Sequence, residues 1–198
     1  DSSSSESKKT LLVWGGSSSV GSTTIQLATA SGLRVVTTAS RANFDYVRSL
    51  GAAAVFDYRS PTVVEDLVNE IKGPARELVG VYDAIGEAET SVAHLARVLD
   101  ALGGDAKARF EVASVLPSDG NPYGLRSKFI WGLALAFPEN SDPCKAIWED
   151  FVEPALARVQ LQAKPDPLVV GRGLEAVQRG LDVQQAGVSA AKVVISLV

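Results

Sequence analysis

Short apolar runs alternate along this chain with segments in which apolar residues recur every three or four positions. The runs lie at residues 11–14, 33–38, 53–56, 79–84 and 109–115. They are nearly continuous, with few polar residues between the apolar ones, as is typical of strands whose two faces are both buried. The runs therefore predict the strands of a parallel sheet.

The segments between the runs predict helices, because their apolar residues form stripes at helical spacing. One stripe consists of Val64, Leu67, Val68 and Ile71, and another of Val92, Leu95, Ala96 and Leu99. Helices are expected at residues 19–31, 43–50, 60–73 and 92–103. Regular alternation of strands and helices predicts an α/β fold, with a Rossmann-type doubly wound parallel sheet and helices on both faces.

The last third of the chain has a less regular pattern. Residues 117–143 are rich in Pro, Gly and aromatic residues, and they predict a loop and short-helix excursion over a site or an interface. The elements expected beyond them are a helix at 145–158, a strand at 168–170, a helix carrying Leu174, Val177 and Leu181, and a strand at 192–197.

The composition narrows the class of protein. With 198 residues, 46% of them hydrophobic and 21% charged, the chain suits one large globular domain, or one domain with part of another. A net charge of −4 argues against a nucleic-acid partner, and no apolar run approaches the roughly 18 residues of a membrane span. Cys144 is the single cysteine, so a reducing, cytoplasmic location is expected. The Ser-rich, charged residues 1–9 predict a disordered linker.

Residues 15–21, Gly-Gly-Ser-Ser-Ser-Val-Gly, join the first strand to the first helix. Backbone N–H groups of such a turn, together with the positive end of the helix, can hold a pyrophosphate. The spacing of Gly15, Ser18 and Gly21 resembles a dinucleotide fingerprint with serine at its centre. The predicted phosphate site consists of Gly15, Gly16, Ser17, Ser18, Ser19, Val20 and Gly21. The alternative is a tight turn that binds no ligand.

The same turn is close to a P-loop, which binds nucleoside triphosphates. Residues 16–23 match that pattern except that Ser22 replaces the lysine. Without the lysine the β- and γ-phosphates are poorly neutralised, so an ATPase or GTPase is disfavoured.

Residues that follow the second strand indicate which dinucleotide binds. An NAD site has a carboxylate there for the ribose hydroxyls, whereas residues 38–43 contain Ser40, Arg41 and Asn43 and no carboxylate. Ser40 can donate a hydrogen bond, Arg41 can pair with a 2′-phosphate, and Asn43 can donate or cap the next helix. NADPH is therefore the expected cofactor, with Tyr58 beside its adenosine. The alternatives are a solvated arginine and a tyrosine used only for packing.

With these residues the chain resembles the cofactor-binding half of a medium-chain dehydrogenase/reductase. The nearest branch is that of the zinc-independent quinone oxidoreductases and fungal trans-acting enoyl reductases. The resemblance is carried by residues 12–22, 38–45, 49–61, 82–86 and 173–182.

The resemblance implies an NADPH-dependent reductase of an activated C=C bond, in an enoyl thioester, enone or quinone. Its substrate would be a small molecule or a carrier-bound acyl group, and the protein a monomer or homodimer. By position, Ser17 to Val20 would hold the pyrophosphate and Ser189 would lie beside the cofactor. The residues implied for the nicotinamide half are Ile85, Gly86, Ala113 and Ser114.

The resemblance also implies a division into domains. Residues 10–170 would form the NADPH-binding domain, and residues 171–198 would pack back toward an upstream GroES-like catalytic domain. That domain is not part of this sequence, so the chain alone is expected to bind cofactor with an incomplete active site.

The sequence identifies no catalytic side chain and no metal site. His94 is expected to be a surface or packing residue of the fourth helix. The Tyr-x-x-x-Lys pair of short-chain reductases is absent, since Tyr46, Tyr58, Tyr82 and Tyr123 lack a lysine four places later. Two further functions stay open, a non-catalytic dinucleotide-binding or scaffold domain and a fragment of a zinc-type alcohol dehydrogenase.

Overall fold

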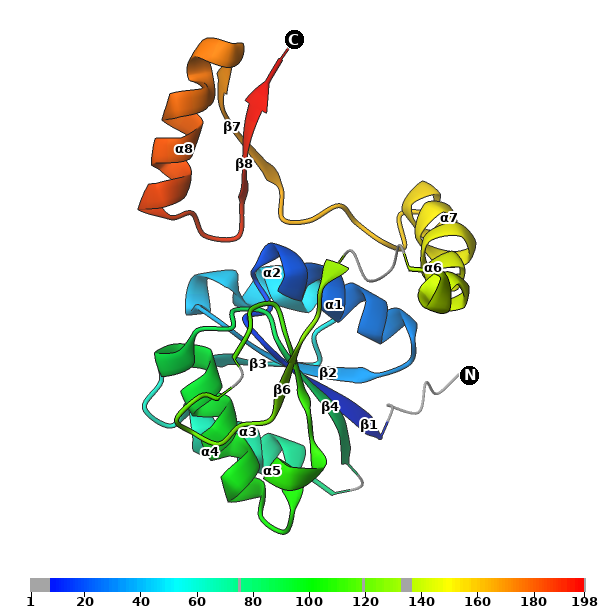
Figure 1. Cartoon of the computed structure of the whole chain (residues 1–198), viewed down its shortest axis with the longest axis vertical. Helices are drawn as coiled ribbons and strands as arrows, with labels where there is room; N and C mark the ends of the chain where they lie inside the picture. Colours follow the sequence, from blue (N-terminus) through cyan, green and yellow to red (C-terminus); the bar gives the residue numbers. More distant parts are fainter. Residues whose placement is uncertain (1–7, 75, 119, 133–136, 198) are drawn as a thin grey trace.

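A computed structural model describes residues 8–74, 76–118, 120–132 and 137–197. The larger part of them forms a six-stranded parallel sheet with the order β3-β2-β1-β4-β5-β6 (Figure 1). Its strands are β1 (Lys9–Trp14), β2 (Arg34–Ala39), β3 (Ala54–Asp57), β4 (Glu77–Asp83), β5 (Val112–Ser114) and β6 (Ser127–Phe129). The predicted doubly wound parallel sheet is confirmed.

Helices cover both faces of this sheet. The covering helices are α1 (Ser19–Ala30) and α2 (Phe44–Ser49) on one face, and α3 (Val63–Ile71) and α4 (Ala93–Leu102) on the other. Successive strand side chains point to opposite faces, so each face needs its own apolar layer. Leu12 packs with Leu67 and Leu95, whereas its neighbour Val13 packs with Ile25 and Val47. All six are fully buried, which explains why the strand sequences are continuously apolar.

The region after α4 differs from the prediction. α5 (Ala106–Arg109) occupies the start of the strand expected at 109–115, so β5 is shorter. β6 lies within residues 117–143, where no strand was predicted. Asn121 builds the turn before β6, because its amide donates to the carbonyls of Ser118 and Leu125, both at 2.8 Å. Its Oδ1 also accepts the N–H of Leu125 at 3.1 Å.

A second, two-stranded parallel sheet contains the end of the chain. Its elements are β7 (Pro167–Arg172), α8 (Val177–Ala186) and β8 (Lys192–Ser196). The chain reaches β7 through α6 (Ser141–Ile147), a π-helical turn (Trp148–Val152), α7 (Glu153–Ala157) and residues 158–166, here called the connector. The boundary expected at residue 170 lies within β7. The linker was expected at residues 1–9, but β1 already begins at Lys9, and residues 1–7 lie outside the described residues.

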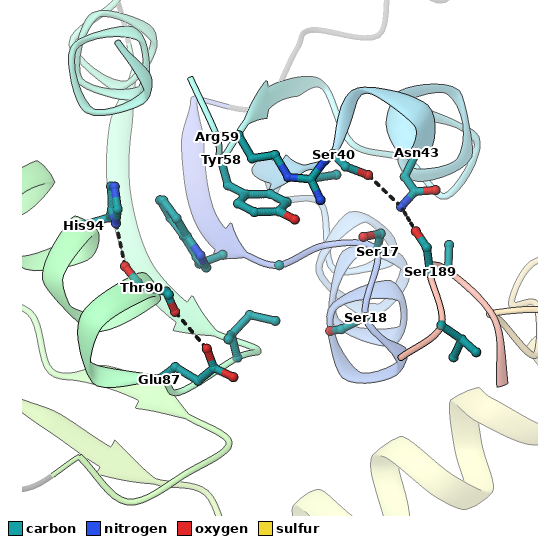
Figure 2. Close-up of a pocket in the computed structure, with 16 residues that line it drawn as sticks. Ser17, Ser18, Ser40, Asn43, Tyr58, Arg59, Glu87, Thr90, His94 and Ser189 are labelled. Atoms are coloured by element: carbon teal, nitrogen blue, oxygen red, sulfur yellow. Dashed lines mark hydrogen bonds between the residues drawn. The ribbon is translucent and has the colours of Figure 1, made fainter. Parts of the chain in front are cut away.

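The carboxyl ends of four strands surround one cavity. Its lining includes Trp14 at the end of β1, Ala39 at the end of β2, Tyr58 after β3 and Ile85 after β4 (Figure 2). Residues 188–190 reach it from the second sheet. Loops after β1 and β4 diverge because the strand order reverses between them, which leaves room for a ligand.

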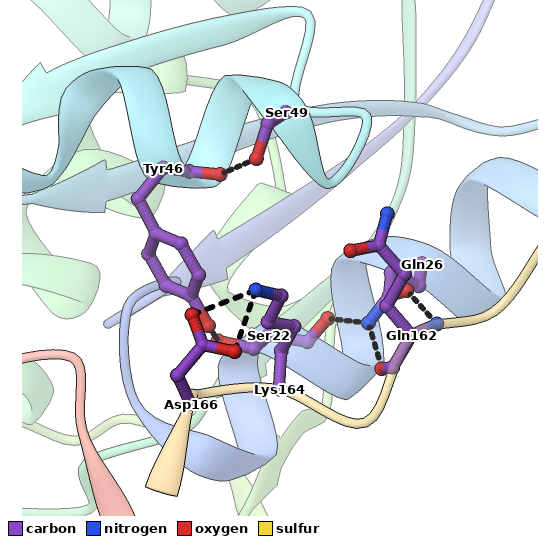
Figure 3. Close-up of polar contacts among 7 residues, drawn as sticks. All are labelled: Ser22, Gln26, Tyr46, Ser49, Gln162, Lys164 and Asp166. Carbon is purple, nitrogen blue, oxygen red and sulfur yellow. Dashed lines mark hydrogen bonds and ion pairs between the residues drawn. The ribbon is translucent and has the colours of Figure 1, made fainter. Parts of the chain in front are cut away.

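The connector is bound to α1 through Gln26, whose side chain is buried (Figure 3). Gln26 Oε1 accepts the N–H of Gln162 at 2.7 Å, and Gln26 Nε2 donates to the Gln162 carbonyl at 3.1 Å. One side chain thus satisfies both backbone groups of Gln162, as a neighbouring strand would. We infer that this pair of bonds fixes the direction in which the chain enters β7.

Tyr46 lies close to the same connector. Its hydroxyl shares a 2.8 Å hydrogen bond with Ser22 Oγ, which joins α2 to α1. Burial raises the pKa of the Tyr46 phenol above its ordinary value of 10.0, and the hydrogen bond with Ser22 opposes part of that effect.

Replacing Gln26 with alanine should loosen the connector. We expect a loss of about 0.5 to 1.5 kcal/mol in the free energy of unfolding and faster backbone hydrogen exchange in residues 160–166. The matched control is Gln178→Ala, which removes an exposed 2.8 Å bond to Asp182 and should change neither quantity appreciably. Equal exchange rates in the two variants would contradict the role given to Gln26.

Replacing Tyr46 with phenylalanine should reduce the loss of stability in alkali. A phenol whose pKa is raised in the folded state contributes stability that is fully present below about pH 10 and lost as the pH rises further. The free energy of unfolding of Tyr46→Phe should therefore fall less than that of the wild type between about pH 9 and pH 11. Urea titrations at both pH values measure this, and parallel losses would show that another group causes the decline.

Candidate functional site

The turn between β1 and α1 requires glycine at its first position. Gly15 has a φ of +81°, in the left-handed region that glycine favours, and a Cβ there would lie 2.6 Å from Ile85 Cγ1. The Gly15 N–H donates to Thr38 Oγ1 at 3.0 Å, and the Gly16 N–H donates to the Thr38 carbonyl at 2.9 Å. These bonds fasten the turn to β2.

Helix α1 begins directly against this turn. A Cβ on Gly21 would lie 2.2 Å from the Gly15 carbonyl oxygen and 2.8 Å from Gly16 Cα. Ser18 caps the helix, since its Oγ accepts the Gly21 N–H at 3.0 Å. Glycine at position 21 therefore sets the distance between the helix and the turn.

Three backbone N–H groups of the turn stay available. Within the described part of the chain, the N–H groups of Ser17, Ser19 and Val20 donate to no protein acceptor. They lie at the amino end of α1, where the helix dipole adds partial positive charge. Amides in this arrangement form a site for an anion.

Ser22, which stands where a P-loop has lysine, has a structural role. Its side chain is fully buried, donates to the Gly16 carbonyl at 3.2 Å and bonds the Tyr46 hydroxyl. It therefore joins α1 to α2 and adds no positive charge to the turn.

The cavity at the ends of the strands has a volume of about 580 Å³. Several residues predicted from the sequence line it, namely Gly15, Ser17, Ser18, Ser40, Asn43, Tyr58, Ile85 and Ser189. Gly16, Ser19, Val20 and Gly21 build the turn behind them. The lining does not include Arg41, Gly86, Ala113 or Ser114.

Asn43 links the two sheets at the edge of the cavity. Its Nδ2 donates to Ser40 Oγ at 3.1 Å and to Ser189 Oγ at 2.9 Å (Figure 2). Asn43 stands at the N-cap position of α2, but the expected capping bond of its side chain is not formed, because that side chain donates to the two serines instead. Next to Ser189, Ala190 adopts a φ of +44°.

Arg41 points to a different partner. Its side chain is 83% exposed, and its Nε donates to Asp57 Oδ2 at 3.2 Å. Arg59, which the sequence analysis did not assign to the site, lines the cavity. Its guanidinium carbon lies 5.1 Å from the centre of the Tyr58 ring.

A tight turn after β4 brings Ile85 to the cavity. Asp83 is buried, and its Oδ1 accepts the N–H groups of Ile85 and Gly86, both at 3.0 Å. Gly86 has a φ of +76°, and a Cβ there would lie 2.7 Å from Leu116 Cβ. Ser114 on β5 is buried, and its Oγ accepts the Leu116 N–H at 3.3 Å.

The start of the helix after β4 adds lining residues that sequence analysis missed. His94 stacks on Trp14 with ring centres 5.2 Å apart, and its Nδ1 lies 2.5 Å from the Thr90 carbonyl. His94 is thus a packing residue, as expected, but it also lines the cavity with Thr90 and Glu87. Glu87 and Thr90 were missed because the helix begins at Ala88 with a π-helical turn (Ala88–Val92), before the apolar stripe from which the helix was predicted.

Comparison with known proteins relates this chain to dehydrogenases. Residues 19–103 match the family described as zinc-binding dehydrogenase. The chain is 44% identical over 189 residues to the trans-enoyl reductase himH of Aspergillus japonicus, covering 96% of this chain and 52% of that protein. It is 39% identical over 189 residues to dehydrogenase orsE of Emericella nidulans, with 96% and 51% covered. The chain therefore spans about half the length of these curated relatives.

Solved structures share the fold. A mycobacterial protein, Rv1454c, in complex with NADPH superposes with a TM-score of 0.64 at 24% identity, covering 98% of this chain and 60% of that one. A mutant enoyl thioester reductase from Candida tropicalis gives a TM-score of 0.66 at 17% identity, covering 96% and 54%. These matches to dehydrogenases and to a trans-enoyl reductase confirm the resemblance stated from the sequence, and the solved structures show that the fold is shared.

Proposed function

We propose that the cavity binds NADPH, with its pyrophosphate on the turn at residues 15–21. The observation that carries this proposal is the set of free N–H groups of Ser17, Ser19 and Val20 at the amino end of α1. Such amides hold a diphosphate without a charged side chain. The volume of about 580 Å³ fits a large part of such a ligand.

The residues that line the other end of the cavity are consistent with a phosphorylated ribose as the ligand group bound there. Ser40 follows β2, where NAD sites carry a carboxylate, and no carboxylate of η1 (Arg41–Asn43) or of the end of β2 lines the cavity. Tyr58 would lie beside the adenosine, and Ser40 and Ser189 offer hydroxyls to a phosphate.

In this proposal the chain is the cofactor-binding part of a reductase. NADPH supplies the hydride when bound, while the protein binds the cofactor, orients it and excludes water. Ile85, Gly86, Ala113 and Ser114 would lie toward the nicotinamide. The names of relatives such as himH support an activated C=C bond, in an enoyl thioester, enone or quinone, as the acceptor. Among the described residues, no group of three or more His, Cys, Asp or Glu side chains could hold a metal ion.

We also propose that residues 10–170 form the cofactor domain and that residues 171–198 contact a GroES-like domain of the same protein. Exposed apolar side chains of η6 (Leu174–Ala176) and α8 support this contact: Leu174, Val177 and Leu181. In the described ranges, no helix is long and apolar enough to cross a membrane.

Direct titration tests cofactor binding by this chain. NADPH should bind with a dissociation constant in the micromolar range, and NADH should bind at least about 10-fold more weakly, because it lacks the charge-assisted contacts to the 2′-phosphate. Calorimetry measures both, with GTP as the control ligand that should not bind. Equal affinities for NADPH and NADH would refute the 2′-phosphate assignment, and binding of neither would refute the proposed function.

Gly21→Ala should disrupt the phosphate site. Its Cβ would lie 2.2 Å from a backbone oxygen, so α1 has to move away from the turn and its amides lose their common direction. We expect a dissociation constant for NADPH raised by about 10-fold or more, and a loss of about 1 to 3 kcal/mol of stability. Gly132→Ala is the matched control, because its Cβ meets open space. The proposal fails if Gly21→Ala, folded by circular dichroism, binds NADPH as the wild type does.

A further inference from the structure

We propose that Arg59, rather than Arg41, is the residue that selects the 2′-phosphate of the cofactor. This inference rests on the proposed function, since it assigns a specificity residue within the same cavity. Arg41 follows the end of β2 and Arg59 follows the end of β3, and their surroundings differ.

Arg41 is paired with a carboxylate and faces solvent. Its Nε donates to Asp57 Oδ2 at 3.2 Å, and its side chain is 83% exposed. It does not line the cavity. To reach a bound phosphate, Arg41 has to leave the carboxylate of Asp57, and its attraction for an anion is reduced by that negative charge.

Arg59 keeps its charge for a ligand. It lines the cavity, and within the described part of the chain its guanidinium pairs with no carboxylate. Its backbone N–H donates to Asp57 Oδ1 at 3.0 Å, so the second oxygen of that carboxylate fixes the main chain of Arg59. Asp57 thereby pairs with the side chain of Arg41 and holds the main chain of Arg59.

Tyr58 orients the guanidinium of Arg59. The guanidinium carbon lies 5.1 Å from the centre of the Tyr58 ring, which is the range of a cation–π contact. A guanidinium stacked by its face leaves its N–H edge free for the paired bonds that a phosphate accepts. Figure 2 shows Arg59 near Ser40, with Glu87 at the opposite end of the cavity.

Two hydroxyls complete the donor set. Asn43 Nδ2 donates to both Ser40 Oγ and Ser189 Oγ, so each hydroxyl oxygen accepts one bond. A serine whose oxygen accepts a bond keeps its own proton for another acceptor. Arg59, Ser40 and Ser189 all line the cavity, and in this proposal they donate to the same phosphate.

The test compares dissociation constants for NADPH and NADH in single variants of this chain. Arg59→Ala should weaken NADPH binding by about 10-fold to 100-fold and leave NADH binding within about 2-fold. Arg59→Lys, which keeps the charge without the planar edge, should fall between wild type and Arg59→Ala. Arg48→Ala is the matched control, because Arg48 pairs with Asp45 at 3.4 Å on the surface of α2 and should change neither constant.

Arg41→Ala is the rival variant. If it removes the preference for NADPH while Arg59→Ala retains it, the inference is overturned in favour of Arg41. An unchanged NADPH to NADH ratio in Arg59→Ala also overturns it, although the proposed function then stands. If the wild-type chain binds neither dinucleotide, the proposed function fails and the inference fails with it. Binding measured at two salt concentrations adds a second readout, since loss of a phosphate contact should lower the salt dependence for NADPH alone.

Discussion

The site depends on the direct contact between the first turn of α1 and the backbone of the turn that precedes it. Gly21 lies so close to the Gly15 carbonyl that no side chain fits between them. This contact places the amino end of the helix dipole at the carboxyl end of β1, in the middle of the sheet order. Ser18 satisfies one N–H by capping, and the N–H groups of Ser17, Ser19 and Val20 donate to no acceptor in the described part of the chain. The sheet, the glycines and the helix start are therefore all parts of the proposed anion site.

The cavity is completed by residues distant in the sequence. Asn43 and Ser189 are 146 positions apart and are joined by a hydrogen bond at the cavity edge. Gln26 holds the connector, which carries the chain toward Ser189, on α1. The amino end of this same helix belongs to the proposed anion site. α1 thus has two roles in the proposed site, since its amino end supplies the free amides and Gln26, farther along the helix, holds the connector that leads to the second sheet. Movement of that helix would change both contacts together.

Local sequence patterns predicted the elements whose apolar residues have a clear period. The strands through Leu12 and Val36 and the helices through Leu67 and Leu95 were found because each contributes to a core on one face of the sheet. β6 was missed because the turn that positions it depends on four bonds of Asn121, a side-chain effect without hydrophobic period. Only some of the residues that line the cavity were predicted, because the others also depend on side-chain contacts that have no hydrophobic period. Turn residues such as Gly15 follow from chain order, whereas the contact of Arg41 with Asp57 and the stacking of Arg59 on Tyr58 depend on how two loops meet.

The two ends of the cavity also differ in charge. Positive potential comes from two loops of the cavity. The loop after β1 supplies the free backbone amides of Ser17, Ser19 and Val20, and the loop after β3 supplies Arg59. Glu87 lies at the end opposite Arg59, where a further anion would be repelled (Figure 2). A ligand with two anionic groups separated by a sugar satisfies both positive places only when its phosphorylated ribose lies at the Arg59 end. The reversed orientation brings a phosphate toward the carboxylate of Glu87. Arg59 therefore contributes to the orientation of the ligand as well as to its affinity, and orientation determines which end of the molecule lies toward β5.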